Sequence, residues 1–324
     1  MRQPIAGLHH VTAIATDPQR NLDFYSEVLG LRLVKKTVNF DDPGTYHLYF
    51  ANEIGTPGTV LTFFPWPMAA RGGAGAGQVT VTSFSIREQS LDFWEQRLLR
   101  AGVPAERSGK RFDEELLTFA DPDGLKLELI ASSTAATQNA WPDASVPAEH
   151  ALNGFDSVSL CEHGYEKTAK LLETMGFRKV AGEGNRFRFE VGAGGPGMRA
   201  DILCASEAPY GRMAAGTVHH IAWRVADDES QKSWRQHLLE KDLDVTPVLD
   251  RCYFHSIYFR EPGGVLFELA TDPPGFAIDE PVDTLGEALK LPPWIEKYRS
   301  QIEQVLPPIQ LHLHRKDEES ARSA

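Results

Sequence analysis

The sequence predicts an α+β protein made of four βαβββ modules arranged in two similar halves. Three observations predict this fold. A pattern of one alternating strand, a helix and further strands recurs four times along the 324 residues. The helices of the first two modules open with nearly the same residues, LDFY at 22–25 and LDFW at 91–94. The turn ADPDG at 120–124 in module two corresponds to REPGG at 260–264 in module four.

Module one begins with a strand near residues 7–15. The helix that follows carries an apolar stripe that ends at Gly30 and is formed by Leu22, Phe24, Tyr25, Val28 and Leu29. The remaining strands of this module are expected around residues 32–39, 45–51 and 59–64.

The other three modules repeat this order. Their opening strands are VTVTSFSI at 79–86, GFDSVSL at 154–160 and TVHHIAWRV at 217–225. Their helices are expected at 90–103, 165–177 and 230–243. The closing strands alternate apolar and polar residues, which is typical of strands with one buried face.

This order divides the chain into three parts. We expect a first pair of modules in residues 1–132, a second pair in residues 150–272, and a C-terminal extension in residues 273–324. The segment between the pairs is rich in Ala, Ser, Thr and Pro and is predicted to be a linker.

The C-terminal extension is Pro-rich at its start. Helices are expected around residues 284–289 and 294–305, and the polar stretch 314–324 is expected to be disordered.

Composition narrows the possible partners. A formal net charge of −12 argues against binding to nucleic acid or to an anionic membrane surface. No stretch approaches the roughly 20 apolar residues of a membrane span, and the N-terminus lacks a signal-peptide pattern. The three cysteines, Cys161, Cys204 and Cys252, are too few for a disulfide framework. We expect a cytoplasmic homo-oligomer whose partners are small molecules.

Two His-His pairs occupy matching places in modules one and four. They are His9-His10 in GLHHVTAIA and His219-His220 in TVHHIAWRV, and Glu268 follows the second pair in GGVLFELAT. Two histidines and one carboxylate can hold a metal on one face and leave the opposite positions open. This ligand set suits Fe(II), Mn(II), Zn(II) or Ni(II).

Modules two and three provide an internal comparison. Val81 and Ser157 stand where modules one and four have the second histidine of each pair. Module two has Glu128 in the place of Glu268 but no histidine to accompany it. The candidate metal ligands are therefore complete only when modules one and four are combined.

Strand geometry leaves open which histidine of each pair faces the metal. Neighbouring side chains of a strand point to opposite faces, so one histidine of each pair should point away. Only a twist or a β-bulge would bring the other one back towards the same site.

These residues carry a resemblance to a known family. The strand-helix-strand modules resemble the vicinal oxygen chelate superfamily, in which the modules form cup-shaped mixed sheets. The motifs HHVT, HHIAW and FELATDP and the segment PPW-x3-YRSQIEQVLPP resemble those of its hydroquinone ring-cleaving dioxygenases. The resemblance covers nearly the whole chain.

The resemblance implies a site as well as a fold. It implies that His10, His220 and Glu268 bind Fe(II). It also implies that five further residues lie around the metal, namely His9, Thr12, His219, Arg251 and Tyr258.

Each surrounding residue has a possible chemical role. The Tyr258 hydroxyl could orient a substrate oxygen or relay its proton, and the Arg251 donor fork suits a phenolate. His219 or His9 could act as the acid-base group, or each could only support its neighbouring histidine.

The predicted function is Fe(II)-dependent, extradiol-type cleavage of a hydroquinone or substituted hydroquinone, with both atoms of O2 entering the product. A small aromatic diol and O2 are then the partners. One alternative is a glyoxalase-like isomerase or hydrolase that uses Zn(II) or Ni(II). Another is a non-catalytic protein that sequesters a small molecule. A catechol is the alternative substrate, and Ser157 at the third-module position favours hydroquinone over it.

Overall fold

The computed structural model describes residues 3–133 and 140–311 and contains two eight-stranded mixed sheets. In order across the first sheet, the strands are β14 (Leu249–Asp250), β15 (Phe254–Arg260), β16 (Leu266–Pro274), β13 (Val218–Val225), β1 (Leu8–Ala15), β4 (Val60–Pro65), β3 (Asp42–Ala51) and β2 (Arg32–Asn39). In order across the second, they are β10 (Arg178–Glu183), β11 (Arg186–Glu190), β12 (Arg199–Cys204), β9 (Phe155–Glu162), β5 (Gln78–Arg87), β8 (Lys126–Ser132), β7 (Glu114–Ala120) and β6 (Ala105–Arg111).

Each module contributes one helix after its first strand. The helices are α1 (Pro18–Asp23), which continues as a π-helix (Phe24–Val28), α2 (Leu91–Arg100), α3 (Glu166–Thr174) and α4 (Asp228–Leu239). A fifth helix, α5 (Arg299–Val305), belongs to the C-terminal extension. Short 3₁₀ turns occur at Glu88–Ser90, Ala148–His150, Phe276–Ile278, Val282–Thr284 and Glu296–Tyr298. The predicted α+β fold of four βαβββ modules is confirmed.

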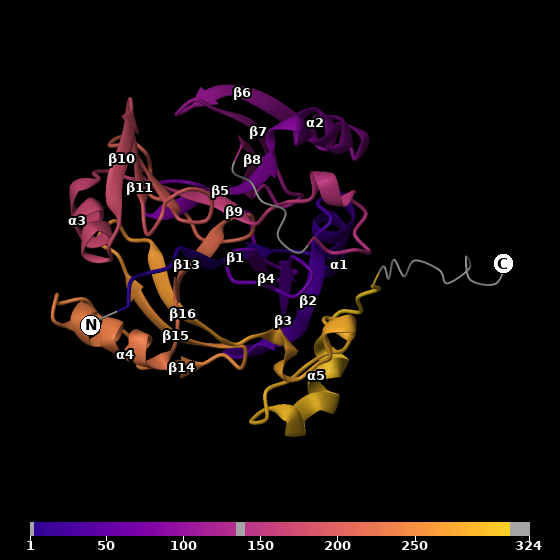
Figure 1. Cartoon of the computed structure of the whole chain (residues 1–324). Coiled ribbons are helices and arrows are strands. Elements are labelled where there is room, and N and C mark those ends of the chain that lie inside the picture. The colour runs from indigo at the N-terminus through magenta and orange to yellow at the C-terminus, as the bar shows by residue number, and fades with distance from the viewer. Residues whose placement is uncertain (1–2, 134–139, 312–324) are drawn as a thin grey trace.

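The two sheets do not follow the order of the modules along the chain. Strand β1 pairs antiparallel with β13, so modules one and four form the first sheet. Strand β5 pairs antiparallel with β9, so modules two and three form the second. Figure 1 shows the second sheet in the upper half and the first sheet curled around the centre of the lower half. The predicted limits 1–132 and 150–272 thus describe pairs along the chain, while the hydrogen-bonded halves combine one module from each pair.

The buried core accounts for the alternation of apolar and polar residues along the strands. One large cluster of buried apolar side chains includes Trp94, Trp223, Phe84 and Phe155 and spans both sheets. A smaller cluster lies on the other face of the first sheet, where Tyr49 and Phe254 pack with Phe276 and Leu285 of the C-terminal extension. Val146, in the described part of the predicted linker, is also buried in the large cluster.

The C-terminal extension differs in part from the prediction. A helix was expected at 284–289, but the chain makes only a 3₁₀ turn at Val282–Thr284, since Gly286 has a positive φ of 82° and Leu289 bridges to Lys36 of β2. Helix α5 lies within the second predicted helix. The predicted disordered tail, 314–324, lies outside the described residues. Within the described ranges, no helix is long and apolar enough to cross a membrane.

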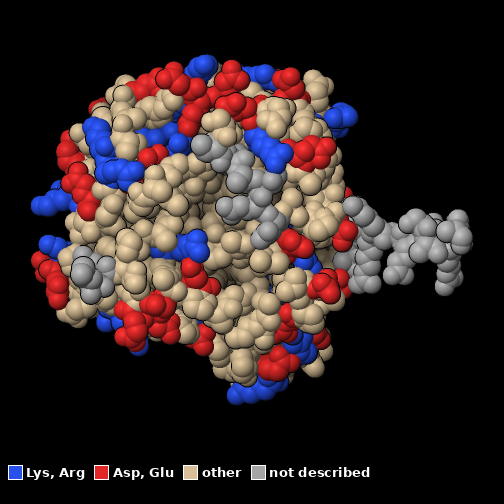
Figure 2. Space-filling model, viewed as in Figure 1, with Lys and Arg blue, Asp and Glu red and all other residues tan. Residues whose placement is uncertain are grey.

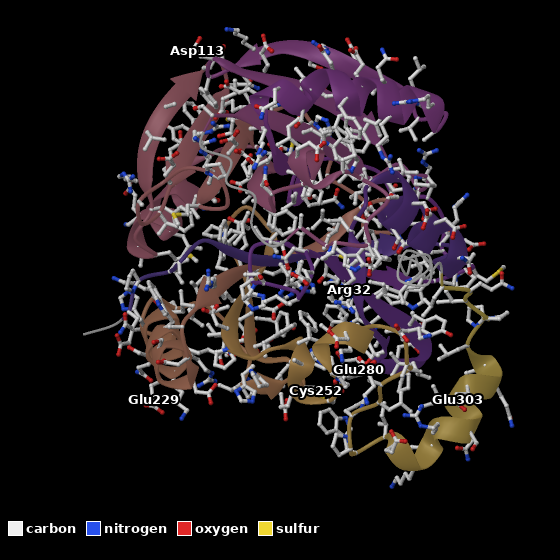
Figure 3. The ribbon with its side chains drawn as sticks, turned by 45° about the vertical axis from the view of Figure 1, so that its right-hand side comes forward. Arg32, Asp113, Glu229, Cys252, Glu280 and Glu303 are labelled. Carbon is white, nitrogen blue, oxygen red and sulfur yellow. The ribbon has the colours of Figure 1, made fainter. Side chains whose placement is uncertain are left out.

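Lys35 of β2 links the C-terminal extension to the first sheet through two ion pairs. Its side chain is 0% exposed, and its Nζ lies 2.6 Å from a carboxylate oxygen of Asp279 and also contacts the carboxylate of Glu280. Arg32, on the same strand, donates to the carbonyl of Asp283 at 3.0 Å. Figure 3 shows Arg32 and Glu280 at this junction.

Replacing Lys35 with methionine is expected to lower the free energy of unfolding by about 3 kcal/mol, because it leaves the buried Glu280 carboxylate without its cation. Chemical denaturation measures this loss. The matched control is Lys232→Met, which removes an exposed partner of Glu229 and should change stability by less than about 0.5 kcal/mol. Equal losses of unfolding free energy in the two variants would contradict a stabilising role for the ion pairs of Lys35.

Candidate metal centre

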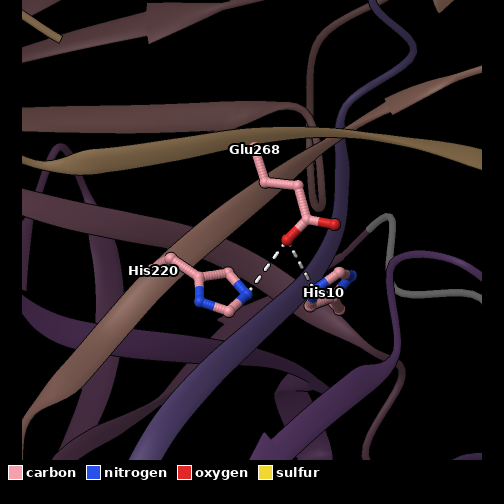
Figure 4. A group of neighbouring side chains, drawn as sticks. All are labelled: His10, His220 and Glu268. Atoms are coloured by element: carbon pink, nitrogen blue, oxygen red, sulfur yellow. Dashed lines mark ion pairs between the residues drawn. The ribbon is translucent and has the colours of Figure 1, made fainter. Parts of the chain in front are cut away.

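Three predicted ligands meet on one face of the first sheet. His10 lies on β1, His220 on β13 and Glu268 on β16, three strands that are neighbours in the sheet. Their candidate ligand atoms all lie within 4.8 Å of one another, and all three side chains are buried. Figure 4 shows both imidazoles directed at the carboxylate. In the described part of the chain, this is the one group of three or more such residues that could hold a metal.

Strand register explains the convergence. Thr12 of β1 pairs with His220, and Ala222 of β13 pairs with Glu268. Residues two apart share a face of a strand, and paired residues on neighbouring strands share that face too. His10, His220 and Glu268 therefore project from the same face, although they come from the two ends of the sequence.

Two β-bulges determine which histidine of each pair faces the candidate metal site. The register of β1 against β13 shifts between Leu8 and His10, so His9 is an extra residue. It shifts again opposite Thr12 and Ala13, so His219 is an extra residue of β13. Each extra histidine turns towards its neighbour. The Nδ1–Nδ1 distance is 2.9 Å between His9 and His10 and 2.7 Å between His219 and His220.

These contacts define a consistent set of tautomers. With Nε2 of His10 directed at Glu268, its Nδ1 carries the hydrogen and donates to Nδ1 of His9. Nε2 of His9 then donates to the carbonyl of Thr271 at 3.2 Å. Burial, followed by the charge of His10, lowers the pKa of His9 to about 3. Burial and His220 lower that of His219 to about 3 as well. Both supporting histidines are therefore neutral near pH 7.

Glu268 presents its oxygens differently. Ser256 donates a hydrogen bond to Oε1. Oε2 lies 3.3 Å from Nε2 of His10 and 3.0 Å from Nε2 of His220, and among the described residues it has no hydrogen-bond partner. Although burial alone would raise it, the two histidines hold the pKa of Glu268 well below its usual range.

The donor set fits a divalent transition metal. In the tautomers above, both Nε2 atoms carry lone pairs that face a carboxylate oxygen, and such a buried group calls for a cation between them. Two imidazoles and one carboxylate suit Fe(II), and three protein ligands leave positions for exogenous ligands. The side chains of His10, His220 and Glu268 therefore fit a divalent metal ion.

A cavity of about 380 Å³ opens next to these residues. Its aromatic walls include Phe40, Phe64, Trp66 and Phe254. Its polar lining includes His47, Tyr49, His219, Arg251 and Tyr258. The volume lies within the range of small-molecule sites. A larger cavity of about 780 Å³ lies against the C-terminal extension and is lined by none of the three ligands.

The other predicted site residues fall into two groups. Tyr258 pairs with Glu268 across β15 and β16, so the REPGG turn does preserve the register, and its ring lies 5.6 Å from that of His220. Arg251 donates from Nε to the Tyr258 hydroxyl at 3.3 Å, and burial raises the pKa of this tyrosine. Both line the cavity together with His219. Thr12 and His9 are buried behind the ligands, and neither lines the cavity.

Two residues of β3 were missed from the sequence. His47 and Tyr49 line the cavity and are joined by a 2.8 Å hydrogen bond. They occur in an ordinary alternating strand, HLYF, which gives no motif. The available signal was the repeat itself, because Tyr49 pairs with Thr62 on β4 as Tyr258 pairs with Glu268 on β16.

The second sheet shows what replaces a metal site. Glu128 pairs with Ser83 there, as Glu268 pairs with Ala222 in the first sheet. Its carboxylate is bound by both terminal nitrogens of Arg111, at 2.6 and 2.7 Å. A guanidinium thus neutralises the carboxylate that, in the first sheet, faces two histidines.

Comparisons with known proteins agree with this geometry. The family model described as Glyoxalase/Bleomycin resistance protein/Dioxygenase superfamily matches residues 7–129. MhqO of Bacillus subtilis (strain 168), named as a candidate ring-cleaving dioxygenase, is 49% identical over 314 residues, 96% of this chain and 99% of MhqO. Chlorohydroquinone/hydroquinone 1,2-dioxygenase of Sphingobium indicum is 35% identical over 307 residues, 92% of this chain and 95% of that protein.

A solved structure supports the same grouping. The crystal structure of a candidate dioxygenase from Bacillus subtilis has a TM-score of 0.92 and 49% identity, and the match covers 96% of this chain and 99% of that one. The chain therefore belongs to the glyoxalase, bleomycin resistance protein and dioxygenase superfamily. Within it, the chain groups with the ring-cleaving dioxygenases and is an enzyme of that class. The resemblance drawn from the motifs is confirmed.

Proposed function

We propose that the enzyme is an Fe(II)-dependent, extradiol-type dioxygenase that opens the ring of hydroquinone or a substituted hydroquinone, with both atoms of O2 entering the product. The observation that carries this proposal is the group His10, His220 and Glu268, two members of which, His10 and His220, line a cavity with aromatic walls. The 35% identity to a hydroquinone 1,2-dioxygenase over nearly the whole chain supports the choice of substrate.

The chain would hold the metal and the ring by different groups. His10, His220 and Glu268 would bind Fe(II), which when present lets electron density pass between an aromatic ring and dioxygen. Phe254 packs with its ring centre 4.9 Å from that of His10, and Phe64 lies across the cavity beside His219 at 5.7 Å. An aromatic substrate can pack against these rings.

The polar lining would act on the substrate oxygens. The Tyr258 hydroxyl accepts from Arg251, so its own hydrogen can be donated to an oxygen that becomes negative. Arg251 adds a permanent positive charge, which is anchored by Asp41 at 3.2 Å. His219 accepts from His220 at Nδ1, which leaves its Nε2–H for the cavity. We propose His219 rather than His9 as the imidazole that meets the substrate.

The surface is compatible with a small-molecule substrate. Figure 2 shows acidic and basic side chains interspersed over the face in view, with a hollow near its centre that is walled largely by tan, uncharged residues. With a net charge of −12, this surface gives no reason to expect an electrostatic grip on nucleic acid.

Oxygen uptake tests the proposal. Protein loaded anaerobically with Fe(II) should consume dioxygen when given hydroquinone or methylhydroquinone, and should be slower with catechol. Tight metal binding without uptake on any of the three diphenols would overturn the proposal. It would favour a glyoxalase-like or sequestering role for the same site.

His9 supports the site from behind, and its loss should weaken metal binding. Replacing His9 with leucine removes the acceptor of the His10 Nδ1–H and is expected to lower metal affinity by about 10- to 100-fold. Competition against a chelator with known affinity measures this change. The control is His150→Leu, which removes a ring between modules two and three that stacks on Phe93 of α2, and it should leave the affinity unchanged.

A further inference from the structure

A second tyrosine stands opposite Tyr258 in the cavity. Thr62 of β4 pairs with Thr12 of β1, and Glu268 of β16 pairs with Ala222 of β13. Modules one and four are related by a pseudo-twofold axis, and Thr12 corresponds to Ala222. Thr62 therefore has the position in module one that Glu268 has in module four. Tyr49 pairs with Thr62 as Tyr258 pairs with Glu268. The two tyrosines therefore lie on either side of the candidate metal centre, one on β3 and the other on β15, and on the same face of the sheet.

The hydrogen bonds of the two tyrosines run in opposite directions. Thr62 donates to Thr12 at 2.8 Å, so its oxygen can only accept from Nε2 of His47, also at 2.8 Å. With its hydrogen at Nε2, His47 accepts at Nδ1 from the Tyr49 hydroxyl at 2.8 Å. Tyr258, in contrast, accepts from Arg251. Tyr49 thus donates its hydrogen to His47 and keeps lone pairs that can accept, whereas Tyr258 accepts from Arg251 and keeps a hydrogen that it can donate.

The surroundings keep this arrangement in place. Tyr49 is 1% exposed and Thr62 is 0% exposed. Burial, followed by the charges of His10 and His220, lowers the pKa of His47 well below its usual range. In the free protein, His47 is therefore neutral and its Nδ1 accepts from the Tyr49 hydroxyl. His47 can keep a proton only while a negatively charged substrate oxygen lies in the cavity and raises its pKa.

We propose that Tyr49 is a catalytic residue that takes the proton of the substrate hydroxyl, with His47 as the positioning residue that receives the proton of Tyr49. This inference rests on the proposed function. The substrate O–H bond breaks and a new O–H bond forms at Tyr49, while the Tyr49 O–H bond breaks and an N–H bond forms at Nδ1 of His47. No electrons are exchanged. A neutral substrate and a neutral imidazole become an oxyanion and an imidazolium that still donates to Thr62.

The two sides of the cavity then have complementary tasks. Tyr49 and His47 remove a proton, and Tyr258 and Arg251 stabilise the negative charge that remains on the substrate. A hydroxylated aromatic that enters in its neutral form is the class of substrate that this arrangement takes.

Steady-state kinetics provide the first test. In Tyr49→Phe the ring stays and the hydroxyl is lost, so kcat for hydroquinone should fall by about 100-fold or more, while KM and metal content change little. The matched control is Tyr253→Phe. Its ring lies 6.1 Å from that of Tyr49, but its hydroxyl bonds to Asp279 at 3.2 Å and it lines the other cavity. The control should keep full activity, and equal rates for both variants and the wild type would overturn the proposal.

Proton counting provides a second test that needs no turnover. The probe is 4-nitrophenol, whose absorbance distinguishes the neutral from the ionised form, bound to Zn(II)-loaded protein. Calorimetry in two buffers with different ionisation enthalpies counts the protons released on binding. The wild type should bind the ionised probe and retain the proton, whereas Tyr49→Phe should release it to the buffer. Release by the wild type, or retention by Tyr49→Phe, would overturn the proposal.

Variants of His47 separate hydrogen bonding from proton uptake. His47→Leu should release the proton as Tyr49→Phe does. His47→Asn offers an amide oxygen to the Tyr49 hydroxyl but no basic nitrogen, so it should also release the proton. Retention of the proton by His47→Asn would show that another group receives it. If the wild type consumes no oxygen with hydroquinone, the proposed function fails, while the proton count with 4-nitrophenol still decides the role of Tyr49.

Discussion

Replacing Glu268 with glutamine is expected to abolish dioxygen uptake and to weaken metal binding by more than about 100-fold, because a neutral amide replaces the carboxylate in the ligand set. Oε2 of Glu268 is the atom that faces both Nε2 atoms, at 3.3 and 3.0 Å, so no neighbouring group can take its place without a rearrangement of the sheet. Metal content after dialysis and dioxygen uptake with hydroquinone measure the two effects.

The repeat supplies a matched control for this variant. Glu128 has the same register in the second sheet, but it binds Arg111 and Ser83. Glu128→Gln should lower the free energy of unfolding by about 1–3 kcal/mol and leave metal content and dioxygen uptake unchanged. If Glu128→Gln lost metal, or Glu268→Gln kept it, the assignment of the metal site to the first sheet would be wrong.

Tyr258→Phe is expected to lower kcat by about 10²- to 10³-fold with metal content unchanged, because it removes one hydrogen-bond donor from a buried site where negative charge develops. The ring that packs against His220 is retained, so the ligand geometry should persist. Single-turnover kinetics with Fe(II)-loaded protein separate this loss from any effect on substrate binding.

A tyrosine outside the cavity controls for the loss of a hydroxyl. Tyr165 stacks on Phe187 in module three, and Tyr165→Phe should retain the wild-type rate. A Tyr258→Phe enzyme with an unchanged rate would contradict the role given to the Tyr258–Arg251 pair.

The candidate ligand set could be predicted from the sequence because it depends on local patterns. The repeated His-His pairs place His10 and His220 at equivalent strand positions, and the alternation of VLFELA places Glu268 on one face of the closing strand of module four. Comparison with modules two and three singles out modules one and four. The motif resemblance then favoured His10 and His220 within their pairs. The structure brings these three residues together.

Other features depend on contacts between distant segments. The pairing of β1 with β13 joins residues at opposite ends of the chain, and no local pattern fixes which module shares a sheet with which. Each bulge arises because one strand of the pair has one extra residue, His9 or His219. Strict alternation would point these two side chains away from the candidate site, whereas the bulges turn them towards their neighbouring histidines. Tyr49 and His47 are recognisable only once the register of β3 against β4 is known.

Labelling with ¹⁸O₂ tests the central claim most directly. Fe(II)-loaded protein given hydroquinone under ¹⁸O₂ should yield a ring-opened product that carries two labelled oxygen atoms, as judged by mass spectrometry under conditions that limit exchange with water. A product with one labelled atom or none, or an intact ring after oxygen has been consumed, would contradict ring cleavage by a dioxygenase at this site.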